Sequence, residues 1–159
     1  EAFKSTGTAR LAALALSNAR IIDLAFENPE PVRAELAALQ DAWLLYPDAG
    51  NAGRGGARPE TLVVLDGTWR QTRKMLRRLP ELARFPGFSL PSNVTETPRD
   101  RLRESPRPGA RSTLESIADA LALLDSPECG QNLLDLHERF VERTRRARGQ
   151  LGAKAPGEP

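Results

Sequence analysis

Residues 61–69 read Thr-Leu-Val-Val-Leu-Asp-Gly-Thr-Trp, and this stretch decides the fold expected for the chain. The apolar run over 61–65 has the length of a buried strand. It stops at Asp66, turns on Gly67, and gives way to a helical pattern from Thr68. In open α/β sheets, ligands bind just beyond the carboxyl ends of such strands. Asp66 is therefore expected at a ligand-binding edge, with Trp69 opening the next helix.

The same residues also have a purely structural interpretation. A core strand, an N-capped helix and a buried tryptophan would explain the pattern equally well. In the functional interpretation, Asp66 is an acid or base, Gly67 lets a backbone approach a ligand, Thr68 offers a hydroxyl, and Trp69 forms a stacking wall. Both interpretations stay open on the pattern alone.

Further apolar and helical patterns surround this stretch. Helices are expected over 8–16, from Pro31 onward, and over 68–84, 112–124 and 132–148, with strands at 21–22, 42–46, 61–65 and 88–90. The Gly-rich residues 48–59 are the best internal candidate for disorder, and 93–111 are expected to be irregular. We expect a single α/β domain over residues 1–149, built on a parallel sheet with helices on both faces, and a disordered tail over 150–159.

Composition indicates an ordinary globular protein. The chain has 159 residues, of which 40% are hydrophobic and 28% charged. No apolar run approaches the roughly 20 residues needed to span a bilayer, and no signal peptide is visible, so we expect a cytoplasmic protein without membrane contact. Cys129 is the single cysteine and His137 the single histidine, so no disulfide or metal site is expected. Cys129 is expected in a loop, and His137 at or near the surface without a catalytic role.

The positive charge is concentrated rather than large. The formal net charge is only +2, but residues 70–84 hold six cations and a single acid, Glu81. Five of these cations recur at helical spacings of three and four: Arg70, Arg73, Lys74, Arg77 and Arg78. Such a face is ordinarily just solvated. Because no acid is interleaved to neutralise it, we expect it to contact the phosphates of a nucleic acid.

A second motif lies at Ser112-Thr-Leu-Glu115. A serine answered by an acid three residues later is a capping box, and that structural role is sufficient to explain it. A helix amino end preceded by Arg111 is also suited to an anion or carboxylate. Arg101 and Arg103 lie shortly before it among prolines. We expect their charges to be exposed or bound to a ligand.

Taken together, four elements resemble the DTW-domain family, the tRNA-uridine aminocarboxypropyltransferases. They are Thr8-Ala-Arg-Leu11, Leu45-Tyr-Pro47, the signature Asp66-Gly-Thr-Trp69 with its continuation to Met75, and Ser112-Thr-Leu-Glu115. Four elements in the right order are far more specific than any one alone. The family's Cys-rich and His-containing elements, with any zinc site, are expected upstream of Glu1, so that the amino-terminal part of the family domain is missing here.

The resemblance implies a SPOUT-like α/β fold, knotted near its carboxyl end and monomeric, that binds S-adenosylmethionine. Family members transfer the 3-amino-3-carboxypropyl group of this donor to N3 of a uridine in tRNA and release methylthioadenosine. The imide nitrogen is a poor nucleophile until it loses its proton, which a positioned carboxylate can accept. The sulfonium is already a good leaving group, so no metal is required.

By the same resemblance, Asp66 is the expected catalytic residue, which accepts the uridine proton or steadies the amino group of the donor. The expected cofactor contacts are Leu65, Asp66, Thr68, Trp69, Ser112, Thr113 and Leu114. The expected tRNA contacts are Arg10, Arg70, Arg73, Lys74, Arg77, Arg101 and Arg103.

Two alternatives remain at this stage. A SPOUT-type RNA methyltransferase would use the same cofactor but release adenosylhomocysteine. A non-catalytic RNA-binding module would bind tRNA through the same arginines without any affinity for the cofactor.

Overall fold

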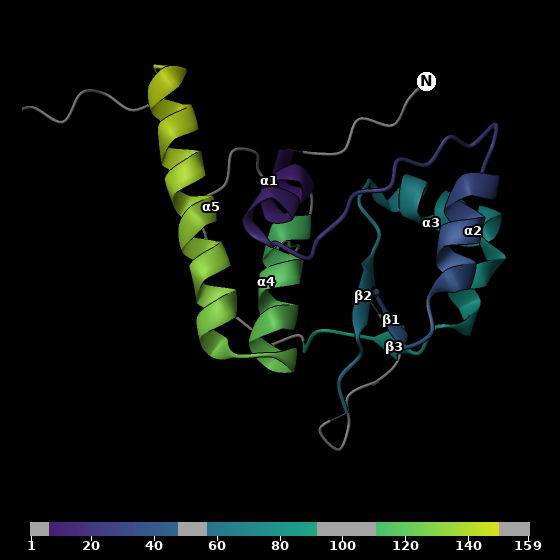
Figure 1. Ribbon diagram of the computed structural model, residues 1–159. Coiled ribbons are helices and arrows are strands. Elements are labelled where there is room, and N and C mark those ends of the chain that lie inside the picture. Colours follow the sequence, from purple (N-terminus) through teal and green to yellow (C-terminus); the bar gives the residue numbers. More distant parts are fainter. Residues whose placement is uncertain (1–6, 48–56, 92–110, 150–159) are drawn as a thin grey trace, which may run out of the picture.

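The computed structural model describes residues 7–47, 57–91 and 111–149 of the chain. Figure 1 shows the arrangement of the elements. In chain order they are α1 (Gly7–Ala15), α2 (Glu30–Ala38), β1 (Ala42–Leu45), β2 (Thr61–Val64), α3 (Trp69–Arg78), the 3₁₀ helix η1 (Pro80–Arg84), β3 (Gly87–Phe88), α4 (Thr113–Leu124) and α5 (Pro127–Ala147). This is a mixed α/β fold, as the sequence predicts.

Within the described residues, the sheet has three strands in the order β2-β1-β3, and both neighbours run parallel to β1. Ala42 pairs with Thr61, and Leu45 pairs with both Val64 and Phe88. The parallel sheet is therefore confirmed. Every residue of β1 is buried, whereas every residue of β2 is half-buried. The expectation that 61–65 is a buried strand is wrong, because β2 is an edge strand and β1 is the central one.

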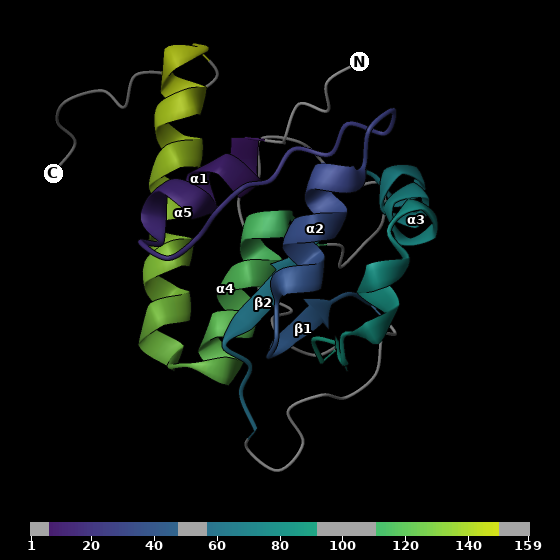
Figure 2. The ribbon, with the colours of Figure 1, turned by 45° about the vertical axis from the view of Figure 1, so that its right-hand side comes forward.

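Helices cover both faces of the sheet. In Figures 1 and 2, α2 and α3 lie on one side of the strands, and α1, α4 and α5 lie on the other. The alternation of side chains along β1 explains this, since successive residues of a strand point to opposite faces. Ala42 and Leu44 belong to a cluster with α2, α3 and η1, whereas Trp43 and Leu45 pack with Ala120 of α4.

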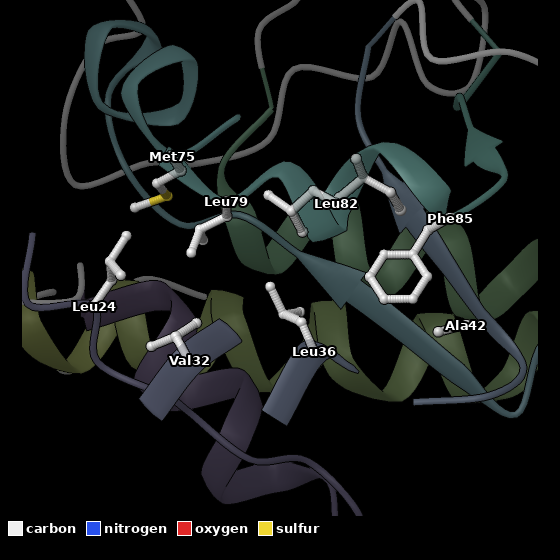
Figure 3. Close-up of a cluster of buried hydrophobic side chains, with 9 residues drawn as sticks. Leu24, Val32, Leu36, Ala42, Met75, Leu79, Leu82 and Phe85 are labelled. Atoms are coloured by element: carbon white, nitrogen blue, oxygen red, sulfur yellow. The ribbon is translucent and has the colours of Figure 1, made fainter. Parts of the chain in front are cut away.

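The larger of these clusters holds α2 and α3 against the sheet. Val32 and Leu36 of α2 lie opposite Met75 and Leu79, and Leu82 of η1 completes the contact (Figure 3). On the other side, Leu114 and Ala118 of α4 pack against α1 and α5. Helix α4 thus lies between the sheet and the two outer helices, and no other described helix has as many buried residues.

The helix expected over 68–84 is interrupted. It ends at Arg78, Leu79 is non-helical with φ −121° and ψ 77°, and a 3₁₀ helix begins at Pro80. A proline disfavours the helical region for the residue before it and donates no backbone hydrogen bond. With this break in the helix, both Leu79 and Leu82 are buried in the core.

Three other expectations need correction. Ile21 and Ile22 form no strand, and both side chains are exposed. The last helix begins at Pro127 rather than at 132, because Ser126 caps it and proline at the first position is already suited to the helix. Strand β3 covers 87–88 rather than 88–90.

Several expectations fall outside the described residues. These are disorder over most of 48–59, the irregular segment before Arg111 with Arg101 and Arg103, and the tail over 150–159. The SPOUT-like topology and the knot stay predictions. In the described part of the chain, no helix combines the length and apolar character needed to cross a membrane.

Candidate active site

A pocket of about 330 Å³ opens at the carboxyl edge of the sheet. Leu45 of β1 and Val64 of β2 line it, together with Leu90, two residues beyond the end of β3. A volume of this size suits a small molecule or a nucleotide-sized group. The other lining residues are Tyr46, Pro47, Leu65, Gly67, Trp69, Thr72, Arg111, Thr113 and Ser116.

The two sequence motifs meet beside this pocket. The Thr113 hydroxyl donates a hydrogen bond of 2.6 Å to Asp66 Oδ1. The two residues are 47 positions apart in sequence and come from the end of β2 and the first residue of α4. Leu65, Gly67 and Thr113 line the pocket, whereas Asp66 is not among its lining residues and is joined to it through the hydrogen bond from Thr113. The expected placement of Asp66 just beyond a strand is confirmed.

Helix α3 begins at the pocket with a complete capping box. The Thr68 hydroxyl accepts a hydrogen bond from Gln71 N at 3.4 Å, and the Gln71 side chain accepts one from Thr68 N at 2.7 Å. Trp69 follows with 42% of its surface exposed. Its ring meets that of Tyr46 edge-on, with 6.3 Å between the ring centroids. Trp69 is therefore not the buried tryptophan of the structural interpretation, and the two rings form an aromatic wall of the pocket.

Helix α4 begins in the same way. The Ser112 hydroxyl accepts from Glu115 N at 3.2 Å, and Glu115 accepts from Ser112 N at 2.6 Å, so the expected capping box is confirmed. Leu114 is fully buried against α1. A contact between Leu114 and a cofactor would therefore have to use its backbone, and Ser112 and Thr68 use their hydroxyls for capping.

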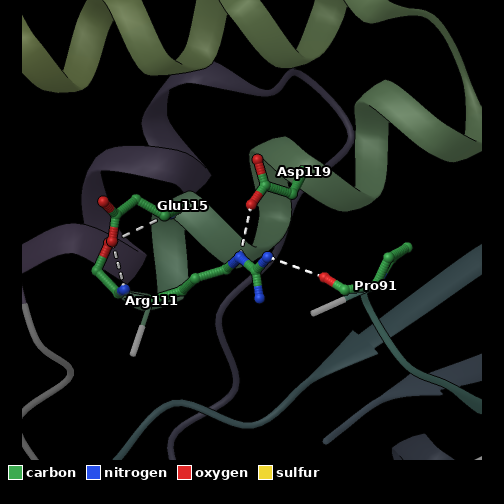
Figure 4. A network of polar contacts seen from close by, with 5 residues as sticks. Pro91, Arg111, Glu115 and Asp119 are labelled. Atoms are coloured by element: carbon green, nitrogen blue, oxygen red, sulfur yellow. Dashed lines mark hydrogen bonds and ion pairs between the residues drawn. The ribbon is translucent and has the colours of Figure 1, made fainter. Parts of the chain in front are cut away.

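An ion pair behind the pocket was not anticipated from the sequence. Arg111 Nε lies 2.8 Å from Asp119 Oδ2, and Arg111 Nη2 donates to the carbonyl of Pro91 at 3.1 Å (Figure 4). The Asp119 side chain is only 4% exposed. A signal was present, because an acid among the apolar residues of 113–124 needs a partner once it is buried.

Only some of the residues expected to contact nucleic acid lie together on one exposed helix face. Arg70, Arg73 and Arg77 are exposed along α3. Lys74 is half-buried, and its ammonium lies 3.9 Å from the centroid of the Phe26 ring. Arg10 is exposed on α1, in the layer on the other side of the sheet, beside a shallow depression next to Asp23.

His137 and Cys129 lie away from this pocket. His137 is 3% exposed, so the expectation of a surface position is wrong. Cys129 is exposed, but it lies in the first turn of α5 rather than in a loop. Within 7–47, 57–91 and 111–149, no three histidine, cysteine or acidic side chains gather closely enough to hold a metal ion.

A parallel sheet covered on both faces, with a pocket beyond its strand ends, is the arrangement in which open α/β sheets bind their ligands. The particular family follows from the sequence, since the DTW domain matches residues 1–145. The chain belongs to the DTW-domain family.

One curated relative is tRNA-uridine aminocarboxypropyltransferase 2 of Drosophila melanogaster. It is 39% identical to this chain over 97 residues, which cover 57% of this chain and 38% of the relative. The chain therefore spans about two fifths of the length of that relative. No solved structure matches the fold.

Proposed function

We propose that this protein transfers the 3-amino-3-carboxypropyl group of S-adenosylmethionine to N3 of a uridine in tRNA. The observation that carries the proposal is the hydrogen bond between Asp66 and Thr113, of which Thr113 lines the pocket. It joins the two motifs that characterise the resemblance to the DTW-domain family. Membership of that family and the printed name of the Drosophila melanogaster relative support the same reaction.

The pocket suits the donor. Leu65, Trp69 and Thr113 are expected cofactor contacts that line it, and Tyr46 adds a second aromatic ring. Aromatic rings of this kind stack well on a purine. When bound, the donor supplies an electrophilic carbon next to a sulfonium leaving group. The protein then has to hold the two reactants together and exclude water.

Asp66 is the residue proposed to act on the acceptor. Its carboxylate accepts the proton from uridine N3, which converts the imide nitrogen into a nucleophile. Thr113 fixes one carboxylate oxygen of Asp66 through its 2.6 Å hydrogen bond, and so limits rotation of the side chain. Because the Thr113 backbone belongs to α4, that helix orients the base.

The basic face of α3 is proposed to bind the tRNA backbone. Arg70 directly follows Trp69 in sequence, so the positive charge begins at the pocket. Arg73 and Arg77 continue it one turn at a time, and both are exposed. Phosphates held along α3 would therefore bring the attached nucleotide close to Asp66.

The test compares the unchanged protein with the variant Asp66→Asn on a tRNA transcript with S-adenosylmethionine. Mass spectrometry of the digested tRNA should find aminocarboxypropyluridine, formed about 10²–10⁴ times more slowly by the variant. Affinity for tRNA should be unchanged. If the variant modifies tRNA at the original rate, Asp66 is not the base. If the product carries a methyl group, the protein is a methyltransferase, and if tRNA binds without modification, it is an RNA-binding module.

A further inference from the structure

Arg111 is the one charged side chain among the described residues that line the pocket. The remaining lining is apolar, aromatic or neutral, with Thr72, Thr113 and Ser116 as its hydroxyl groups. A ligand with a negative group would therefore meet a single strong partner here. In an apolar pocket, such a group cannot be held without a compensating charge.

At least two contacts hold the guanidinium of Arg111. Asp119 accepts from Nε at 2.8 Å, and the carbonyl of Pro91 accepts from Nη2 at 3.1 Å. These contacts come from α4 on one side and from the chain after β3 on the other, as Figure 4 shows. Two fixed directions on a planar group set the orientation of the whole plane.

The position of Asp119 is costly to maintain. Its side chain is 4% exposed, and it lies between the buried Ala118 and Ala120 of α4. A buried ion pair contributes little to stability compared with an apolar pair of the same volume. The burial of Asp119 is therefore better explained if Asp119 orients Arg111 than if it contributes to stability.

We infer that Arg111 binds the carboxylate of the amino-acid portion of the donor, and that Asp119 is a positioning residue that orients Arg111 for it. A guanidinium N–H makes a short, charge-assisted hydrogen bond to a carboxylate oxygen. This inference rests on the proposed function. It also gives a reason for the choice of group transferred, because the aminocarboxypropyl chain would be held at its far end while the adenosine occupies the aromatic wall.

Methylthioadenosine provides the test, because it has the adenosine and sulfur of the donor but no amino-acid portion. Adenosylhomocysteine has that portion without the sulfonium charge. In calorimetric titrations, Arg111→Gln should raise the Kd of S-adenosylmethionine and adenosylhomocysteine on the order of 10- to 100-fold. The Kd of methylthioadenosine should stay within about twofold. Arg20→Gln is the matched control, since Arg20 is an exposed arginine paired with Glu35 and does not line the pocket.

Two further variants separate positioning from folding. Asp119→Asn should lower affinity for adenosylhomocysteine but not for methylthioadenosine, a selectivity that mere loss of structure would not produce. Arg111→Lys keeps a charge for Asp119 but loses the planar guanidinium, so it should show the same selective loss of affinity for adenosylhomocysteine while the protein stays folded by circular dichroism.

Three results would overturn the inference. One is an equal loss of affinity for all three ligands in Arg111→Lys, and another is no loss of affinity for any of them. Neither of these two results would contradict the proposed donor site. The third is failure of the unchanged protein to bind any of the three, which would overturn the proposed function as well.

Discussion

Helices α3 and α4 begin alike but differ in what surrounds them. Each starts beside the pocket with a complete capping box, at Thr68 in one and Ser112 in the other. Helix α3 buries only Thr72 and Met75 and carries its arginines outward. Helix α4 buries five of its twelve residues, including two acids.

The difference shows how one local motif serves two purposes. In α3 the cap starts a helix whose charges face solvent, where a polyanion can neutralise them. In α4 the cap starts a helix whose charge faces inward, where Asp119 meets Arg111. We therefore propose that α3 binds the macromolecule and that α4 orients the site.

The largest effect on stability should come from crowding α4. A Cβ added at Gly130 would lie 2.5 Å from the Ala118 carbonyl and 2.7 Å from the Ala122 Cβ. Gly130→Ala should therefore push α5 from α4 and lower the free energy of unfolding by about 3 kcal/mol, as overpacking does. Urea denaturation measures this.

The matched control is Gly7→Ala, since nothing lies within 4 Å of a Cβ at Gly7. It should be neutral or slightly stabilising, because alanine is a better helix former than glycine. Equal stability of the two variants would contradict the close approach of α4 and α5.

The next largest effect should be on tRNA affinity. Replacing three exposed arginines of α3 by glutamine should lower the affinity about 10- to 100-fold near 0.1 M salt and reduce the salt dependence of log K by about 2–3. The variants are Arg70→Gln, Arg73→Gln and Arg77→Gln combined. Stability should change little, because all three side chains are exposed. Filter binding at several salt concentrations measures both quantities.

A control of equal charge is available on α5, on the other side of the sheet (Figure 1). The three exposed arginines there are Arg139, Arg143 and Arg146. Their combined replacement should weaken tRNA binding much less. Equal losses in the two triple variants would mean that binding follows net charge rather than the α3 face.

The two caps give a smaller effect and a direct comparison. Thr68→Ala and Ser112→Ala should each lower the free energy of unfolding by about 1 kcal/mol, because each removes an acceptor for an unpaired helix N–H. If the helices serve the two roles assigned to them, Ser112→Ala should also weaken donor binding by displacing Thr113. A loss of donor affinity with Thr68→Ala alone would reverse the assignment.

The smallest effect concerns the ion pair that ties α2 to η1, with Arg33 Nε 2.7 Å from Glu81 Oε1. A hydrogen bond from its own backbone N–H lowers the pKa of Glu81, burial opposes this, and Arg33 lowers it further. A lowered folded-state pKa contributes stability above the unfolded value near 4.5 that is lost as the pH falls below it.

Glu81→Gln should therefore give a slightly lower Tm at pH 7 and the same Tm as the unchanged protein at about pH 3. Thermal melts followed by circular dichroism at both values measure it. A difference in Tm that grows toward acid pH would contradict the lowered pKa of Glu81.

The sequence predicted the parts of the fold that depend on local pattern. The capping box at Ser112, the strand over 42–45 and the placement of Asp66 beyond β2 all follow from residues close together in the chain. The order of the strands does not follow from local pattern, because an apolar run of this length is equally compatible with an edge strand and a central strand. The pattern therefore predicts a buried β2 and does not identify β1 as the central strand.

The candidate site shows the same limit. The Asp66–Thr113 contact joined two motifs that the resemblance had already named, but no pattern in the residues gave the pairing itself. Asp119 was missed because its partner Arg111 precedes the helix, at a spacing of eight residues that no helical periodicity predicts. The burial of His137 was also missed, because a single polar residue in a charged helix gives no sign of which way it faces.

The most direct test of the central claim is to identify the nucleoside released when the protein is incubated with tRNA and S-adenosylmethionine. The account predicts methylthioadenosine, formed in equal amount to modified uridine and almost abolished in Asp66→Asn. Release of adenosylhomocysteine, or formation of methylthioadenosine at the same rate without tRNA or with Asp66→Asn, would contradict it.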